Sequence, residues 1–432
     1  MMHEFKVSNF LSFREEQTLS FEATSDKTYE DLYCVEKKAN LRLLKMGMIY
    51  GANASGKSNV LKAIDYLRTF VLSGRKDKTM SINPPFFAFD PQYASKPTQF
   101  YLSFFIGETR YIYKLELTKE VVLYEKLEFY PGTQPAKIFE RTYDEKEDIA
   151  VIEFGDKSKL GLDSKDKAIF ESHIIRNVSV IGAYAGVNIS SPPLDEVLDW
   201  FKNKLAGIIA PTADLVQRTT DLLSRNDQFK DFVLERLRKA DYNVGDIIVK
   251  DRPLLDKEKN AIDRISPFLL GGSFASTKAD IQVSLNHLLK EIFFSHHTSR
   301  GEFELPFESQ SEGTKRYYGL SSVMYQLFEE NTIAVIDEIE SSLHFDLINY
   351  FIRSFLVNSR SSQLLFTTHN IQILAEDFLR RDVIWFTEKQ EDGSTILFSY
   401  PEVRLHKNIS PYNAYKIGKI GAKPELGSIY MD

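Results

Sequence analysis

A glycine-rich segment that ends in lysine and serine carries the strongest chemical signal in the sequence. Residues 51–58 read Gly-Ala-Asn-Ala-Ser-Gly-Lys-Ser, which fits the spacing Gly-x-x-x-x-Gly-Lys-Ser. Glycines at both ends permit a tight turn whose backbone N–H groups point inward, and a helix that follows aims its positive end at the same space. The segment therefore predicts a cradle for phosphate groups.

The residues of this cradle have different expected roles. Lys57 is expected to contact the β and γ phosphates, and the Ser58 hydroxyl is expected to bind Mg²⁺, so ATP with Mg²⁺ is the expected ligand. The alternative is a chance glycine turn, and the strand and helix patterns that flank the loop weigh against it. The remaining predicted phosphate-binding residues are Gly51, Asn53, Ala54, Ser55, Gly56 and Asn59.

Two acids follow an apolar run further along the chain. Residues 332–336 read Thr-Ile-Ala-Val-Ile, which is typical of a strand buried in a parallel sheet, and Asp337 and Glu338 come next. Asp337 is the expected Mg²⁺ ligand, and Glu338 is the expected base that orients or deprotonates the attacking water. Alone, the segment could also be a strand that ends in a solvated acidic turn. Together with residues 51–58, it predicts two catalytic carboxylates at the ligand edge of the sheet.

Two further polar segments flank these acids. Ser311-Glu-Gly313-Thr314 opens a helix predicted by apolar residues at a 3.6-residue period, and such a helix start binds anions well. Residues 363–366 predict a strand, and His369 follows it. A single histidine at a strand end is usually structural, but here the other motifs precede it in order, so His369 is expected to contact the γ-phosphate.

The surrounding pattern predicts the elements that must position these residues. Residues 46–50 read as a strand and residues 60–71 as an amphipathic helix, so the cradle lies in a strand-loop-helix unit. Residues 5–21 predict a β-hairpin at a sheet edge, and residues 99–130 and 137–154 predict antiparallel strands. Residues 22–45 are expected to form a loop.

The second half of the chain changes character after Pro192 and Pro193. Helices are predicted over residues 194–205, 212–223, 226–239 and 281–294, and alternating strands and helices resume beyond residue 303. The expected organisation is an amino-terminal part of an ATPase head at 1–190, a helical insertion at 191–302 and a carboxy-terminal part of the head at 303–432. The predicted fold class is α/β, with an antiparallel β-subdomain.

The motifs in this order resemble those of the SMC/RecF-like ABC ATPases, in particular the compact AAA-type proteins related to OLD-family and abortive-infection ATPases. The resemblance covers nearly the whole chain. It rests on the segments NFLSF, IYGANASGKSNVLKAI, SEGTKR, VIDEIESSLH, LLFTTHN, RRDVIWFTEK and NAYKIGKIGAKPEL. It implies a P-loop NTPase fold of the ABC/SMC-head type.

The resemblance also implies how the segments work together. Ser311, Gly313 and Thr314 would form the ABC signature, which contacts the γ-phosphate held by the opposite subunit of a head-to-tail dimer. Residues 341–344 resemble a D-loop, and His369 resembles the switch histidine. The sequence departs from the family in two places, because the signature reads Ser-Glu-Gly-Thr instead of Ser-Gly-Gly and Gln99 is only a weak match to the Q-loop glutamine.

Composition bounds the remaining possibilities. A net charge of -7 gives no global attraction to nucleic acid or anionic membranes, although a local basic patch could still bind nucleic acid. Cys34 is the only cysteine, which excludes an internal disulfide and a cysteine-based zinc site and fits a cytoplasmic location. Residue windows long and apolar enough to span a membrane are absent, so no membrane domain is expected.

Several other features are expected to be missing. Only 63 residues follow His369, too few for the fused TOPRIM nuclease of OLD-family proteins, and the insertion shows no sustained heptads that would form a long coiled-coil arm. His296, His297 and His406 lack the ligand spacing of a zinc site.

The resemblance suggests a subunit that binds and hydrolyses ATP and forms a homodimer or higher oligomer. It further suggests a sensor or regulator in a bacterial anti-phage system that controls a separately encoded effector. The alternative is a RecF-like DNA-maintenance ATPase that binds DNA. A transporter subunit is disfavoured, since it would need a membrane partner.

Overall fold

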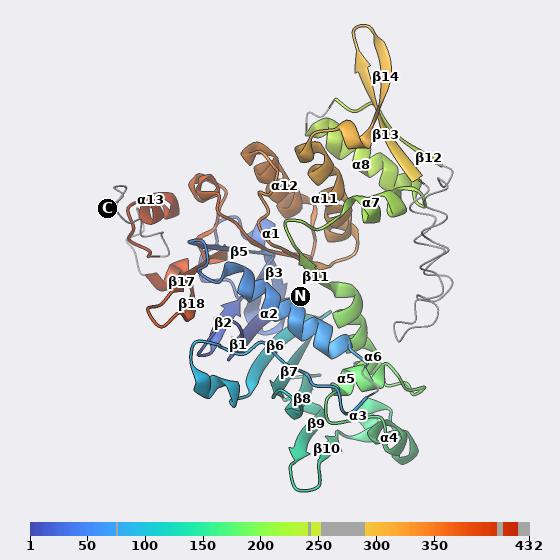
Figure 1. Ribbon diagram of the computed structural model, residues 1–432, viewed down its shortest axis with the longest axis vertical. Coiled ribbons are helices and arrows are strands. Elements are labelled where there is room, and N and C mark those ends of the chain that lie inside the picture. Colours follow the sequence, from blue (N-terminus) through green and yellow to red (C-terminus); the bar gives the residue numbers. More distant parts are fainter. Residues whose placement is uncertain (75–76, 241–242, 252–289, 404–408, 422–432) are drawn as a thin grey trace. The chain divides into compact units, whose positions relative to one another are not determined.

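The computed structural model describes residues 1–74, 77–240, 243–251, 290–403 and 409–421 (Figure 1). The chain folds into two compact units. The first unit consists of Met1–Pro211, Leu327–Glu340 and Ile352–Asp432, and the second of Thr212–Gln326 and Ser341–Phe351.

A six-stranded sheet, in the order β11-β15-β16-β5-β17-β18, is the centre of the first unit. Its first five strands are parallel and β18 pairs antiparallel to β17. The residues of β5, β15 and β16 are buried throughout, as expected for a parallel sheet covered on both faces. The strands are β5 (Met46–Gly51), β11 (Leu205–Ile209), β15 (Ile333–Ile336), β16 (Gln363–Thr367), β17 (Ile384–Lys389) and β18 (Thr395–Ser399).

Helix α2 (Lys57–Leu72) follows β5 after a short loop and buries Val60, Ile64, Leu67 and Val71. These are the apolar positions that predicted the helix, so the predicted strand-loop-helix unit is confirmed. Figure 1 shows β5 beside β17, which comes from the far end of the chain. The predicted return of the carboxy-terminal segment to an interrupted parallel sheet is also confirmed.

A seven-stranded antiparallel sheet, in the order β10-β9-β8-β7-β6-β1-β2, completes the first unit. The predicted amino-terminal hairpin forms, and β2 lies at the sheet edge as expected. The alternating aromatic and β-branched residues of the next segments form the predicted antiparallel strands. The strands are β1 (Met2–Ser8), β2 (Gln17–Ser20), β6 (Thr98–Ile106), β7 (Thr109–Leu117), β8 (Val122–Tyr130), β9 (Ala136–Asp144) and β10 (Ile149–Phe154).

The loop predicted over residues 22–45 was wrong. This segment contains a helical turn, α1 (Glu30–Tyr33), and two paired strands, β3 (Cys34–Lys37) and β4 (Leu41–Leu44). Their polar sequence hides a few anchoring positions, because Tyr33, Leu43 and Leu44 are buried, whereas Glu36, Lys38 and Arg42 between them are charged. Short elements held by so few anchors leave no clear period in the sequence.

Residues 157–204 carry short helices of the first unit. The helix predicted over 194–205 is α6 (Pro192–Asp199), which continues into a π-helical turn, η3 (Trp200–Lys204). Leu205 then begins β11, so the prediction ran one residue into a strand. The other helices are α3 (Lys157–Leu160), α4 (Ser164–Glu171) and α5 (Val180–Tyr184).

The second unit combines helices with a three-stranded sheet, in the order β12-β13-β14. Helix α8 (Asp227–Lys239) matches the prediction within one residue, and α7 (Val216–Leu223) begins four residues later than predicted. The helix predicted over 281–294 was wrong in its last part, since residues 290–294 belong to strand β13; residues 281–289 lie outside the described ranges. The elements include β12 (Asp246–Asp251), β13 (Lys290–Thr298), β14 (Gly301–Pro306), α11 (Glu312–Glu329) and α12 (Phe345–Asn358), the last two of which extend into the first unit.

The reason for this error is that Ile292 and Phe294 face one side of β13 and pack on the core of the second unit, a two-residue alternation too short to distinguish from a helix face. The expected helical insertion at 191–302 therefore differs from the structure in two ways. Residues 191–211 belong to the first unit, and the second unit contains an antiparallel sheet as well as helices. Within the described ranges, every helix is too short or too polar to cross a membrane.

Candidate nucleotide-binding site

The glycine-rich loop lies between β5 and α2, where the sequence placed it. A Cβ on Gly51 would come within 2.4 Å of the Ser55 and Thr387 hydroxyls, and a Cβ on Gly56 would come within 2.4 Å of the Thr395 hydroxyl. Gly56 also has a φ of 101°, in the region that favours glycine. Both glycines are therefore required by close packing of the loop against β17 and β18.

Lys57 is nearly enclosed, with 5% of its surface exposed. Its Nζ donates hydrogen bonds to the backbone oxygens of Gly51 (3.0 Å) and Ala52 (2.9 Å). Burial lowers the pKa of the Lys57 ammonium, and the charges of Glu338, Glu340 and Asp337 oppose that shift. The cation thus sits on the loop itself, where phosphate oxygens could replace the carbonyl partners.

Ser58 and Asp337 meet at the end of the sheet. The Ser58 hydroxyl donates to Asp337 Oδ1 at 3.0 Å, and the Thr367 hydroxyl donates to the same oxygen at 2.6 Å. The backbone N–H of Glu338 donates to the Thr367 hydroxyl at 2.8 Å. A serine hydroxyl beside a carboxylate is the oxygen donor set that Mg²⁺ prefers, so the residues present fit the expected ion.

Glu338 and His369 stand at the same edge. Their side chains approach to 3.6 Å between Oε1 and Nε2, and both are partly exposed. Glu338 adopts a φ of 48°, a conformation that costs a non-glycine residue energy and often marks functional sites. The carboxylate of Glu340 accepts a hydrogen bond from the His369 backbone N–H, which fixes the segment after β16.

These residues border one open groove of about 870 Å³. The groove brings together most of the predicted loop residues with Glu338 and His369, and it adds Lys62, which the sequence analysis did not select. Three residues predicted for the cradle and the Mg²⁺ site, Gly51, Ser55 and Asp337, do not line it. Its lining consists of Asn53, Ala54, Gly56, Lys57, Ser58, Asn59, Lys62, Glu338 and His369. A cavity lined by loop N–H groups and lysines, with acids at one end, suits a magnesium-bound polyphosphate.

The predicted signature residues lie in the second unit, at the start of α11. The Ser311 hydroxyl accepts from the Thr314 N–H at 3.1 Å and contacts the Thr314 hydroxyl at 2.7 Å, as an N-cap does. Gly313 occupies the first turn of the same helix. The predicted helix start is confirmed, and its role toward nucleotide remains a prediction.

Gln99 does not border the groove. It lies on β6, where its side chain bonds Ser8 and Glu116. His296 contacts the Asn243 backbone oxygen and the Gln310 amide, and in the described ranges no three potential ligands gather around a metal position. His406 lies outside the described residues.

The sequence analysis missed a hydroxyl network behind the loop. Ser12 Oγ accepts from the Asn59 amide at 2.7 Å and lies 2.8 Å from Thr395 Oγ1, which in turn lies 2.8 Å from the Ser55 backbone oxygen. The turn of the amino-terminal hairpin and the start of β18 are thereby tied to the loop. Ser12 is part of the quoted segment NFLSF, but nothing in the sequence marks Thr395.

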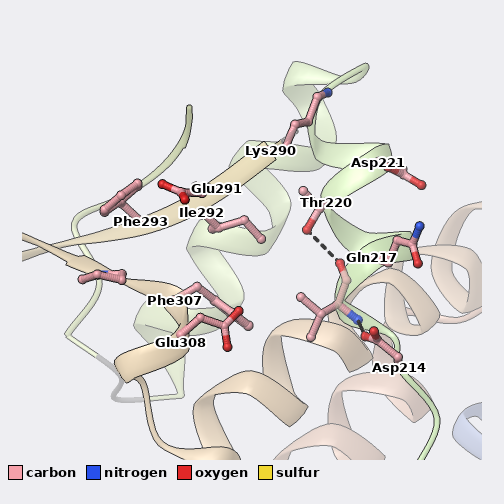
Figure 2. A pocket seen from close by; sticks show the side chains of 12 residues that line it. Asp214, Gln217, Thr220, Asp221, Lys290, Glu291, Ile292, Phe293, Phe307 and Glu308 are labelled. Carbon is pink, nitrogen blue, oxygen red and sulfur yellow. Dashed lines mark hydrogen bonds between the residues drawn. The ribbon is translucent and has the colours of Figure 1, made fainter. Parts of the chain in front are cut away.

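The second unit has a cavity of its own, of about 660 Å³, between α7, β13 and the segment after β14 (Figure 2). Its lining includes Asp214, Asp221, Glu291 and Glu308 but only one basic residue, Lys290. Figure 2 shows Ile292 and Phe307 between these charges. Four acids against one lysine would repel phosphate, so this cavity is not a second triphosphate site.

A family model matches most of the chain. The family model "AAA domain, putative AbiEii toxin, Type IV TA system" matches residues 48–375. The chain belongs to this family. The match confirms the predicted relationship to AAA-type ATPases, and its span runs from β5 and the cradle to beyond His369.

Three solved structures are similar to the chain over most of its length. An SMC head domain from Thermotoga maritima is 14% identical with a TM-score of 0.40 and covers 92% of this chain and 98% of its own length. An SMC head bound to the C-winged helix domain of ScpA is 14% identical with a TM-score of 0.39, and the match covers 92% of this chain and 97% of that chain. An Smc head with an extended coiled coil, bound to the C-terminal domain of ScpA and derived from Pyrococcus furiosus, is 14% identical with a TM-score of 0.40. The match covers 98% of this chain and 99% of that chain. No curated protein sequence matches the chain.

Proposed function

We propose that this family member binds and hydrolyses ATP with Mg²⁺ at composite sites that form when two copies dimerise. The observation that carries the proposal is the convergence of residues from the ends of two strands: Lys57 and Ser58 follow β5, Glu338 follows β15 and lines the same groove, and the Ser58 hydroxyl donates to Asp337. Phosphoryl transfer requires a phosphate cradle, a set of oxygen ligands for Mg²⁺ and an acid that can act on water. This site supplies all three, with Glu338 in the loop after β15 as the acid.

Each side chain has a role that follows from its position. Lys57 and the loop N–H groups neutralise the β and γ phosphates, and Ser58 and Asp337 hold Mg²⁺, which when bound would stabilise charge on the phosphate oxygens. Glu338 orients and deprotonates the attacking water. His369, 3.6 Å from Glu338, donates a hydrogen bond to the γ-phosphate and keeps Glu338 in place.

The dimer part of the proposal concerns the second unit. Ser311, Gly313 and Thr314 present backbone and hydroxyl donors at the start of an 18-residue helix, a natural anion site. In the proposed dimer they contact the γ-phosphate held by the partner subunit's cradle, so each of the two sites needs both chains.

The biological part of the proposal rests on the family description, which names a putative AbiEii toxin of a type IV toxin–antitoxin system. The chain would act in the cytoplasm as a sensor or regulator in anti-phage defence, and nucleotide-driven closure would change its engagement of a separately encoded effector. Affinity purification from the native host tests this, and recovery of membrane permease subunits as the sole partners contradicts it.

The alternative proposal is a DNA-maintenance ATPase. Filter binding of duplex and single-stranded DNA, with and without ATP, separates the two functions. ATP-dependent retention of DNA at physiological salt supports the alternative, whereas retention that vanishes between low and physiological salt is nonspecific binding.

Nucleotide binding itself is tested by calorimetry with ATP and Mg²⁺, and hydrolysis by phosphate release. The wild-type chain is expected to bind and to turn over ATP slowly, with both signals lost in Lys57→Ala. Binding that is equal in the wild type and in Lys57→Ala contradicts the assignment of the cradle.

A further inference from the structure

One phenylalanine of the first unit is left largely open to solvent. Phe89, in the segment between α2 and β6, has 69% of its surface exposed, and Phe86 in the same segment has 41% exposed. Single exposed apolar residues are common on proteins, but two phenylalanines within four residues are less so.

The Phe89 ring is braced from behind. A Cβ on Gly393 would come within 2.8 Å of Phe89 Cδ2, so the ring lies directly on the Gly393 backbone. Phe87, which is buried, meets Phe89 edge to face at 5.8 Å between ring centroids. The Gly393 turn is anchored in turn by an ion pair of 2.9 Å between Asp392 and Arg14.

The segment that carries Phe89 is also fixed to the hairpin turn of residues 9–14. The backbone N–H of Leu11 donates to the Pro85 oxygen at 2.7 Å, and the Phe87 N–H donates to the Asn9 side chain at 3.0 Å. Because its backbone is already fixed, the aromatic ring loses little conformational entropy when it binds a flat partner.

The same two anchors lead directly to the phosphate cradle. Gly393 is two residues from Thr395, at most about 7 Å along the chain, and Thr395 Oγ1 lies 2.8 Å from the Ser55 backbone oxygen. Ser12, one residue after Leu11, bonds Asn59, which lines the groove next to Ser58. The segments that hold the Phe89 ring are therefore the same segments that hold the loop of the phosphate cradle.

We propose that Phe89 forms the base-stacking platform of this nucleotide site and that the base of ATP lies on its open face. This inference rests on the proposed nucleotide binding and specifies where the base goes. Stacking on a phenyl ring favours purines over pyrimidines through contact area and distinguishes adenine from guanine weakly, because every base offers a π-face. The site is thus expected to accept ATP, dATP and GTP with similar affinity.

The first experiment compares Mg²⁺-ATP with Mg²⁺-tripolyphosphate, which has phosphates and no base. The wild type is expected to bind ATP at least tenfold more tightly than tripolyphosphate. Phe89→Ala is expected to reduce ATP affinity about tenfold and leave tripolyphosphate affinity unchanged, and Phe89→Tyr is expected to retain ATP affinity. Phe303→Ala, which removes a 49% exposed phenylalanine of the second unit, is the matched control and should bind both ligands as the wild type does.

A second measurement reports on the ring directly. The chain has two tryptophans, Trp200 and Trp385, both buried, so Phe89→Trp introduces an exposed fluorophore. Stacking predicts that ATP quenches its emission and that tripolyphosphate does not. Equal quenching by both ligands, or unchanged ATP affinity in Phe89→Ala, overturns the platform while Lys57-dependent binding stands. Absence of any ATP binding by the wild type overturns both proposals.

Discussion

The hydroxyl of Ser58 donates a 3.0 Å hydrogen bond to Asp337 across 279 residues of sequence. The bond joins the loop after β5 to the end of β15, and Thr367 from the end of β16 donates to the same carboxylate oxygen. Three neighbouring parallel strands thus deliver their carboxyl ends to one point, which is where open α/β sheets place their ligands.

Thr367 supports two predicted functional residues at once. Thr367→Val keeps the shape of the side chain but removes the donor to Asp337 and the acceptor for the Glu338 N–H. Loss of such a supporting hydrogen bond is expected to weaken apparent Mg²⁺ affinity about 10- to 100-fold in a magnesium titration of ATP turnover. Thr220→Val, which removes a buried hydroxyl in the second unit, is the control, and an unchanged magnesium midpoint in Thr367→Val contradicts the assignment.

Glu338 and Lys57 are expected to fail differently. Glu338→Gln keeps the size of the side chain and removes the base, so ATP binding should persist while turnover falls by at least a hundredfold. Lys57→Ala removes the cation from the cradle, so binding itself should be lost. Calorimetry and phosphate release on the two variants separate these outcomes, and wild-type turnover in either variant is incompatible with its assigned role.

Gly51 is expected to tolerate no side chain. In Gly51→Ala the new Cβ would approach the Thr387 backbone oxygen to 2.6 Å as well as two hydroxyls, so the loop must move. ATP affinity is expected to fall more than tenfold, and the free energy of unfolding is expected to fall by about 1–3 kcal/mol. Gly132→Ala meets nothing within 4 Å and is the control; equal effects in both variants would show that loop geometry is not the cause.

Lys45 predicts a pH effect on stability. It is buried, donates to the Leu356 and Ser359 backbone oxygens near the end of α12, and burial lowers its pKa to about 8 from 10.5. Between these pH values the unfolded chain holds a proton that the folded chain has lost, so the Lys45 contribution to stability rises with pH through this window and is lost as pH falls below about 8.

Chemical denaturation tests this effect. From pH 8 to 10.5 the free energy of unfolding of the wild type should rise relative to that of Lys45→Met by at most about 3 kcal/mol. Lys146→Met, an exposed position, should track the wild type. A constant difference between wild type and Lys45→Met across the window rejects the low pKa.

Much of the site could be predicted because the chemistry demands contiguous residues. The cradle, the acids Asp337 and Glu338, and His369 each follow a strand directly, so local sequence reports both residue type and position. Parallel strands then bring their ends together without further information. This is why distant segments were correctly assigned to one edge of one sheet.

Other features depend on tertiary contacts that leave no local pattern. Thr395 is an ordinary strand residue until β18 places it against Ser55, and Phe89 is one of 32 phenylalanines until its exposure is known. The sheet of the second unit was missed for a similar reason, because β13 buries only Phe294 and Ser295 of its nine residues and shows no long alternation. In each case tertiary packing determines the structure, and the hydrophobic period of the local sequence does not reveal it.

Mixing two inactive variants tests the central claim that each site is shared between two chains. Lys57→Ala disables the cradle. Gly313→Asp adds a negative charge where the partner's γ-phosphate should bind. The helix itself should tolerate this change, because an acidic side chain is favourable in the first turn of a helix. Each variant alone should be inactive. In an equimolar mixture half of the dimers are mixed and each has one intact site, so about a quarter of wild-type turnover should return. Activity no higher than the average of the separate variants would contradict a shared site.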